Sequence, residues 1–174
     1  MPNFDPRPAA QELAAAYRAG ELLVELRGDM RPRSLGEGYD VQDRLIDVLG
    51  LRPRGWKLGV GSIKLKAQAG IGRSIAGRVL APQLYRPGAT VELPNAAPVT
   101  VEFEIAFEIA DDVRPDGPRV VARDVIADTR VAFELVLSRF VDRRAVGWPS
   151  FAADNAGFQA LILGEAIDPK TLPD

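Results

Sequence analysis

The sequence of 174 residues contains no histidine and no cysteine. Without histidine, serine–histidine triads and histidine-ligated zinc sites are excluded. Acid–base chemistry near neutral pH must then use carboxylates, lysine, tyrosine or a metal-bound water. Without cysteine, disulfides, thiolate metal sites and cysteine nucleophiles are excluded as well, which is compatible with a reducing cytosol.

The chain also lacks a strong charge of one sign and a long apolar run. Its formal net charge is -2, and its 22 basic residues are scattered, so we expect neither nucleic acid nor a membrane surface as a partner. The N-terminal MPNFDPRPAA has no basic segment followed by an apolar stretch. We therefore expect a soluble, cytoplasmic protein.

Composition and pattern predict an α+β fold. With 47% hydrophobic residues the chain suits one domain, 1–174, in which a helical N-terminal segment, 1–54, precedes a β-rich body, 55–174. Apolar spacing predicts helices over 5–19 and 34–49, the second opened by a capping box of Ser34 and Glu37. Seven short β-type runs follow, at 55–60, 77–81, 89–93, 99–109, 119–122, 131–137 and 158–164.

The glycine-rich segment 59–77, GVGSIKLKAQAGIGRSIAG, has three interpretations. A phosphate loop would need Gly-Lys-Ser/Thr where GRSIAGRV has Arg78 and Val79, so nucleotide binding is disfavoured. A flexible loop near a site is more plausible, and a plain surface loop is favoured over both.

The segment TVEFEIAFEIADD, 100–112, alternates apolar and acidic residues. The alternation predicts a strand whose apolar residues, Val99 to Ile109 at every second position, point into a core. Glu102, Glu104 and Glu108 then share the other face. That face is either simply solvated or, because glutamates two residues apart repel one another, it binds a divalent cation.

Glu134 lies within the apolar run VAFELVL, 131–137, and needs a partner if it is buried. Either an arginine, Arg130 or Arg139, pairs with it, or it faces the same cation as Glu102 and Glu104. A site of three carboxylates without nitrogen or sulfur ligands selects a hard ion, magnesium or manganese.

Five segments taken together resemble the 2-keto-4-pentenoate hydratase and 4-oxalocrotonate decarboxylase branch of the fumarylacetoacetate hydrolase superfamily. They are YDVQDRL, GWKLGVGS, VEFEIAFEI, AFELVLSRF and FAADNAGFQALILG, in the order and spacing of that branch. The resemblance implies a mixed β-sheet roll behind the helical segment, with the C-terminal part of the family fold missing.

The resemblance also implies site residues. Magnesium or manganese would be held by Glu102, Glu104 and Glu134, and Lys57 would lie at the site as a catalytic and substrate-binding residue. Asp154 and Asn155 would bind substrate, or alternatively would form a helix cap or turn. Glu108 is expected to be structural.

The activity implied is that of a lyase: a metal-dependent hydratase that adds water to a 2-hydroxypenta-2,4-dienoate-type 2-oxo acid in the catabolism of aromatic compounds. Ile75 stands where hydratases of the branch carry an acidic residue. A 4-oxalocrotonate-type decarboxylase is therefore the alternative, and a non-catalytic homologue that assembles with a partner is a third. We expect a small 2-oxo acid as the substrate and a homo-oligomer as the assembly.

Overall fold

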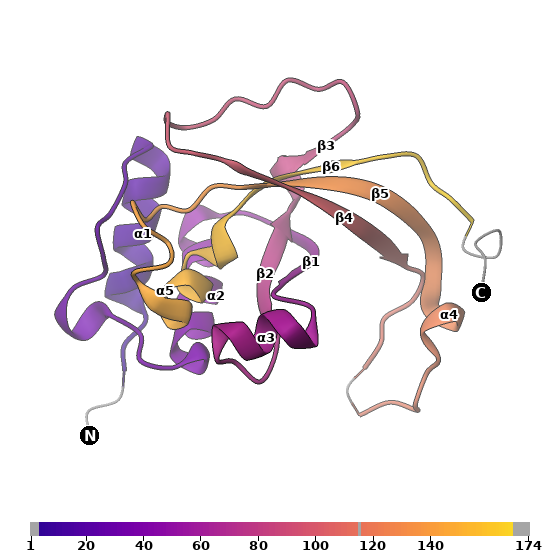
Figure 1. Ribbon diagram of the computed structural model, residues 1–174, viewed down its shortest axis with the longest axis horizontal. Helices are drawn as coiled ribbons and strands as arrows, with labels where there is room; N and C mark the ends of the chain where they lie inside the picture. Colours follow the sequence, from indigo (N-terminus) through magenta and orange to yellow (C-terminus); the bar gives the residue numbers. More distant parts are fainter. Residues whose placement is uncertain (1–3, 115, 169–174) are drawn as a thin grey trace.

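The computed structural model describes residues 4–114 and 116–168 (Figure 1). Its helices are α1 Arg7–Ala19, α2 Leu35–Leu49, α3 Ile63–Ala69, α4 Ala122–Val125 and α5 Gly147–Ala153. Its strands are β1 Pro53–Gly59, β2 Ile75–Leu80, β3 Leu84–Tyr85, β4 Thr100–Ile109, β5 Ile126–Val136 and β6 Phe158–Leu163. The expected α+β class is confirmed in its coarse form, as helices combined with antiparallel and mixed sheets.

Both predicted N-terminal helices are present, and their ends follow the expected signals. At the start of α2 the Ser34 hydroxyl accepts a hydrogen bond of 3.2 Å from the Glu37 amide. The reciprocal half of the capping box differs, because the Glu37 carboxylate accepts from the Arg33 amide at 2.7 Å. Gly50 ends α2 with a φ of 67°, a left-handed conformation that glycine adopts without a steric cost.

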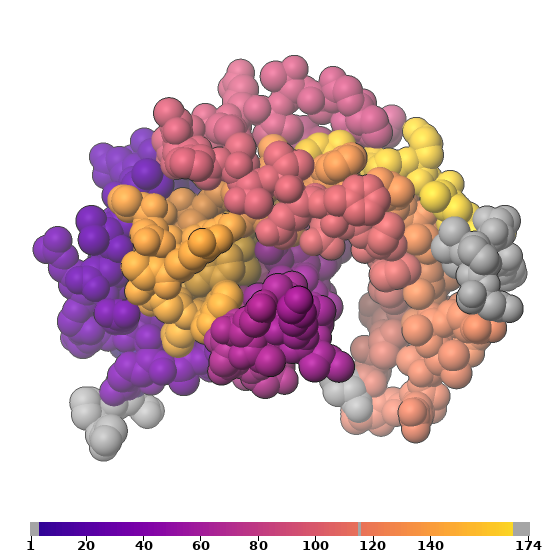
Figure 2. All heavy atoms as spheres, viewed as in Figure 1, coloured from indigo at the N-terminus to yellow at the C-terminus, as the bar shows by residue number. Residues whose placement is uncertain are grey.

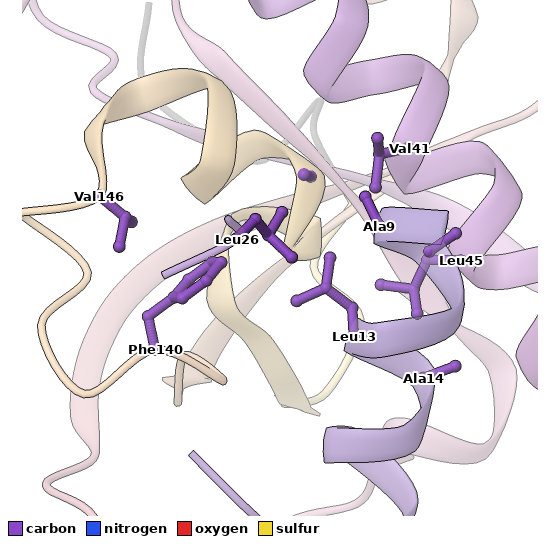
Figure 3. Close-up of a cluster of buried hydrophobic side chains, with 10 residues drawn as sticks. Ala9, Leu13, Ala14, Leu26, Val41, Leu45, Phe140 and Val146 are labelled. Carbon is purple, nitrogen blue, oxygen red and sulfur yellow. The ribbon is translucent and has the colours of Figure 1, made fainter. Parts of the chain in front are cut away.

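The helices α1, α2 and α5 form one side of the molecule around a buried apolar cluster (Figure 3). Leu13 from α1 and Leu45 from α2 meet Leu26 and Phe140, which come from the connecting segments. A second buried cluster joins α2 to the sheets through Ile46, Val79, Leu80, Ala132, Phe158 and Leu161. The helical layer is thus fixed to the strands that carry the candidate site.

The strands form two sheets. β1 and β2 make an antiparallel pair, and the second sheet has the order β3-β6-β5-β4, with β3 parallel to β6 and the other pairs antiparallel. β4 and β5 form a long curved ribbon that extends away from α1, α2 and α5 and has α4 at its far end (Figure 1). Figure 2 shows an open hollow between α3 and the lower part of this ribbon.

Three local predictions were wrong. Residues 63–69, expected in a loop, form α3, since Ser62 caps the helix by accepting from the Leu65 amide at 3.1 Å. The runs 89–93 and 119–122 are not strands, because neither finds a partner strand among the described residues; α4 begins at Ala122 instead. The helix α5 and the two-residue strand β3 were not predicted.

The apolar face of β4 is a further correction. Val101, Phe103, Ile105, Phe107 and Ile109 do not point into a core but are 47% to 65% exposed. The face that the described residues do cover is the acidic one, which lies toward β1. Alternation identified the two faces of the strand correctly but not the face that becomes buried.

Among the described residues, no helix is both long enough and apolar enough to cross a bilayer.

Candidate metal and substrate site

The register of β4 against β5 brings three glutamates together. Glu102 lies directly opposite Glu134, and Glu104 lies opposite Ala132, so the three side chains share one face of the ribbon. One carboxylate oxygen from each glutamate lies within 4.8 Å of the corresponding oxygens of the other two. Glu134 is 2% exposed, while Glu102 and Glu104 are half-buried.

Lys57 reaches this group from the other sheet. It lies on β1, and its Nζ is 3.0 Å from Oε1 of Glu134, with side-chain exposures of 7% and 2%. The contact is an ion pair without hydrogen-bond geometry, so Oε1 is buried and has no hydrogen-bond donor among the described residues. Removing a carboxylate from water in this way is costly unless a cation compensates it.

Gly77 makes room for Lys57, and sequence reasoning missed this role. Gly77 lies opposite Lys57 in the β1–β2 register. A Cβ at this position would approach the Asn155 carbonyl oxygen to 2.7 Å and the Lys57 Cγ to 3.1 Å. The sequence signal was the glycine that begins the β-type run 77–81, GRVLA, since glycine in a strand is typical of close backbone approach.

Burial and neighbouring negative charges raise the pKa values of two of the glutamates. Burial raises the pKa of Glu134 to about 7, with smaller contributions from Glu102 and Glu104, and Lys57 opposes this rise. The pKa of Glu104 is also raised, by burial first and then by the charge of Glu102. Two carboxylates that resist ionisation so close together indicate a site with room for more positive charge.

The arginines considered as partners of Glu134 are engaged elsewhere. Arg130 binds Asp128 at 2.8 Å and Glu108 at 3.3 Å, and Arg139 forms a buried ion pair with Asp154. Glu108 accordingly lies outside the group of three carboxylates, as expected of a structural residue. Of the described cations, Lys57 is the one that pairs with Glu134.

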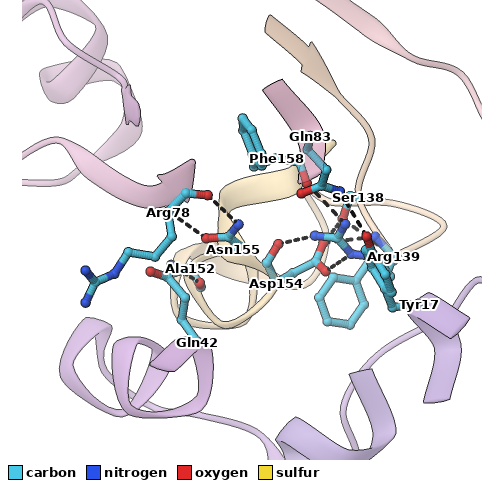
Figure 4. A network of polar contacts seen from close by, with 11 residues as sticks. Tyr17, Gln42, Arg78, Gln83, Ser138, Arg139, Ala152, Asp154, Asn155 and Phe158 are labelled. Carbon is cyan, nitrogen blue, oxygen red and sulfur yellow. Dashed lines mark hydrogen bonds and ion pairs between the residues drawn. The ribbon is translucent and has the colours of Figure 1, made fainter. Parts of the chain in front are cut away.

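Asp154 and Asn155 lie in a polar network (Figure 4). A Cβ added at Gly77, the residue opposite Lys57, would meet the Asn155 carbonyl oxygen, so the network borders the strand pair that carries Lys57. Asp154, which is 0% exposed, accepts hydrogen bonds from the Ser138 hydroxyl at 2.7 Å and from the Arg139 amide at 2.9 Å. The Asn155 side chain accepts from the Arg78 amide at 2.6 Å and donates to the Arg78 carbonyl at 2.9 Å, as a neighbouring strand would. The Asn155 contacts hold the α5–β6 connection against β2, and the Asp154 contacts hold it against the segment that follows β5. A role in substrate binding stays a prediction.

The sequence of the chain is similar to those of known hydratases. The chain is 29% identical to the TodF product hydratase of Pseudomonas putida, over 97% of this chain and 63% of that protein. It is 28% identical to the 2-keto-4-pentenoate hydratase of Paraburkholderia xenovorans, over 94% of this chain and 62% of the relative. The expected resemblance to the hydratase–decarboxylase branch is confirmed. No protein-family model matches the chain.

Solved structures of this branch share the fold. A 4-oxalocrotonate decarboxylase from Pseudomonas putida, complexed with magnesium and adipate, superposes with a TM-score of 0.82 at 20% identity, over 96% of this chain and 65% of that one. The same enzyme complexed with calcium and acetate gives 0.81 at 21% identity, with 64% of its chain covered. The chain spans slightly less than two thirds of the length of these hydratases and of this decarboxylase.

Proposed function

We propose that this chain is a metal-dependent lyase that hydrates a 2-hydroxypenta-2,4-dienoate-type 2-oxo acid. The observation that carries the proposal is the convergence of Glu102, Glu104 and Glu134 beside the single ammonium of Lys57. The hydratase relatives support the reaction type.

The carboxylate group fits a hard divalent ion. Oxygens bound to one ion at roughly 2.0–2.6 Å lie at most about 5 Å apart, and the three glutamate oxygens meet this limit. The buried Oε1 of Glu134 has no hydrogen-bond donor in the described chain and is paired there only with the Lys57 ammonium, so it can also serve as a ligand atom. Oxygen-only ligation favours magnesium or manganese over zinc or copper.

A bound magnesium or manganese ion would act as a Lewis acid on the carboxylate and 2-oxo oxygens of the substrate. The protein's own residues would hold the ion, bind the substrate and transfer a proton. Glu134 and Glu104 would hold their oxygens on one face of the ribbon, and Lys57, fixed at 3.0 Å from Glu134, would bind the anionic substrate and carry a proton.

A 4-oxalocrotonate-type decarboxylation is the second candidate. The fold neighbours that superpose on the chain are such a decarboxylase, and Ile75 offers no carboxylate because it is an apolar residue, fully buried in β2. The same carboxylates and Lys57 would serve either reaction, so the two candidates differ in the substrate that fits.

The test is to incubate the pure protein and MgCl₂ with each dienol acid, and to follow the loss of dienol absorbance together with carbon dioxide release. We expect absorbance loss and a 4-hydroxy-2-oxo acid product without gas. Gas release without hydrated product would favour the decarboxylase. No turnover of either acid would leave the non-catalytic homologue as the better account.

Two variants make this assay specific to the site. Glu104→Gln should abolish turnover, because it removes one of the three grouped carboxylates. Glu108→Gln is the matched control, since it removes a carboxylate from the same face of β4 that pairs instead with Arg130. Equal losses in both variants would argue against the site.

A further inference from the structure

The turn between α5 and β6 holds three consecutive residues in the left-handed conformation. Asn155, Ala156 and Gly157 have φ angles of 51°, 51° and 69°. Glycine adopts such angles without a steric cost, whereas the Cβ of any other residue crowds the backbone. Backbone strain of this kind persists only where surrounding contacts hold it, so the contacts of Asn155 and Ala156 must offset it.

Hydrogen bonds tie this turn to both sheets. The Asn155 side chain accepts from the Arg78 amide at 2.6 Å and donates to the Arg78 carbonyl at 2.9 Å, which fastens the turn to β2 (Figure 4). Two residues later the Gly157 carbonyl accepts from the Leu137 amide at 2.8 Å, directly after the end of β5. The turn therefore connects β2 with β5, two strands whose sheets share no backbone ladder among the described residues.

The stem of Lys57 passes beside this turn, over Gly77. Gly77 lies opposite Lys57 in the register, and a Cβ there would come within 3.1 Å of the Lys57 Cγ. The same Cβ would lie 2.7 Å from the Asn155 carbonyl oxygen and 3.3 Å from the Ala156 Cβ. The lysine stem and the turn thus border one small space, and Asn155 and Ala156 are only 3% and 0% exposed. A stem confined in this way has fewer rotamers that carry its ammonium away from Glu134.

The same contacts favour an indirect role for Asn155 over contact with a substrate. Both polar atoms of its side chain already bond to the backbone of Arg78, so a substrate would reach them only by displacing the turn from β2. Ala156 carries a methyl group at a φ where glycine would avoid the strain. The space over Gly77, which this methyl group borders, gives the group a use.

We propose that Asn155 and Ala156 are positioning residues for Lys57. The left-handed turn fixes β2 and confines the lysine stem, so that the ammonium stays 3.0 Å from Oε1 of Glu134. The catalytic consequence rests on the proposed function, since it supposes that Lys57 carries a proton. The positioning itself does not, because the place of the lysine can be measured without turnover.

The first test measures the access of a reagent to Lys57 in the metal-free protein. The chain is acylated with an N-hydroxysuccinimide ester, and site-resolved mass spectrometry compares Lys57 with Lys64, an exposed residue of α3. We expect Ala156→Gly to raise the ratio of the Lys57 rate to the Lys64 rate about tenfold, because a buried methyl contact is lost and the stem opens locally. Glycine accepts the turn conformation, so this variant should keep the wild-type circular dichroism spectrum.

Two further variants separate positioning from a general loss of stability. Asn155→Ala, which removes both side-chain bonds to Arg78, should raise the ratio by at least as much. Ser138→Ala is the matched control, because it removes a hydrogen bond of 2.7 Å to Asp154 that holds the same connection against the segment after β5 rather than against β2. It should change the ratio by less than about twofold. An unchanged ratio in Ala156→Gly, or an equal rise in Ser138→Ala, would overturn the proposal.

The second test measures turnover of the dienol acid at saturating MgCl₂. A displaced ammonium should lower kcat about tenfold in Ala156→Gly with little change in KM, since a misplaced proton carrier acts mainly on the chemical step. A higher KM in Asn155→Ala with an unchanged kcat would instead indicate substrate binding by that side chain and would refute its positioning role. If the wild type turns over no dienol acid, the proposed function fails, and the acylation ratios still decide how Lys57 is positioned.

Discussion

Glu104 and Glu108 lie four residues apart on the same face of β4, but only Glu104 belongs to the carboxylate group. We predict that Glu104→Gln lowers the affinity for manganese at least tenfold, because even residues that only orient metal ligands change affinity by about 10–100-fold. Titration calorimetry with MnCl₂ measures this. Glu108→Gln should bind as the wild type does, and an unchanged affinity in Glu104→Gln would contradict the proposed ligand set.

Protonation of Glu134 makes metal affinity depend on pH. With its pKa raised to about 7 by burial, Glu134 is largely protonated at pH 6 in the metal-free protein, and the proton competes with the metal. We predict that manganese affinity rises about tenfold per pH unit between pH 5.5 and 7 and levels off above pH 8. Calorimetry across this range measures it, and a flat profile would exclude Glu134 as a ligand.

The stability of the metal-free protein should show the opposite trend. The pKa of Glu134 is raised in the folded state from an ordinary value of 4.5, so its contribution to the free energy of unfolding is complete below pH 4.5. Between pH 4.5 and 7 the unfolded chain releases a proton that the folded chain keeps, and this contribution is lost. Urea unfolding in EDTA should therefore show stability falling over this window, less steeply in Glu134→Gln. An equal slope in both proteins would contradict the assignment.

At the scale of elements, the α5–β6 connection depends on Asp154. This carboxylate is fully buried and holds Ser138 and Arg139, so its replacement leaves the Arg139 guanidinium buried without its charge partner. We predict that Asp154→Asn lowers the free energy of unfolding by about 3–5 kcal/mol. Urea unfolding measures the loss. Asp43→Asn, which breaks the exposed ion pair with Arg78, should cost about 1 kcal/mol or less.

Four other elements, α2, α3, β4 and β5, show how much of the fold could be predicted from the sequence. Ser34 and the periodic residues of α2 were enough to predict that helix, since a cap and an apolar stripe are local signals. The alternation in β4 and β5 predicted both strands for the same reason. The helix α3 carried a cap at Ser62 and a terminal glycine at 70, but its side chains bury little, so no apolar stripe marked it.

The site required more than local signals. The resemblance named Glu102, Glu104, Glu134 and Lys57, and the structure brings these four residues together. That Lys57 pairs with Glu134 follows from the packing of one sheet on another, which no local pattern encodes. Which face of β4 is covered was mispredicted for the same reason, because alternation separates the two faces of a strand but does not say which one packs against another element.

At the scale of the whole molecule, the candidate site joins residues that are far apart in the sequence and that the fold brings together. Lys57 comes from the β1–β2 pair, while the glutamates come from the β4–β5 ribbon, and the two sheets share no backbone ladder among the described residues. In the metal-free protein the junction therefore contains three carboxylates facing one ammonium. Their mutual repulsion opposes the close approach of β4 and β5 at this point.

A divalent ion should relieve this repulsion and stabilise the whole fold. We predict that saturating magnesium or manganese raises the melting temperature relative to EDTA. At 100 times its dissociation constant a ligand that binds only the folded state adds about 2.7 kcal/mol to the free energy of unfolding, and such a gain would shift the melting temperature of a chain of this size by several degrees. Differential scanning calorimetry measures the shift. At the same metal concentration it should fall to about half or less in Glu104→Gln, whose affinity is at least tenfold lower. It should persist in full in Glu108→Gln, since the carboxylate at 108 pairs with Arg130. An undiminished shift in Glu104→Gln would mean that the ion binds elsewhere on the chain.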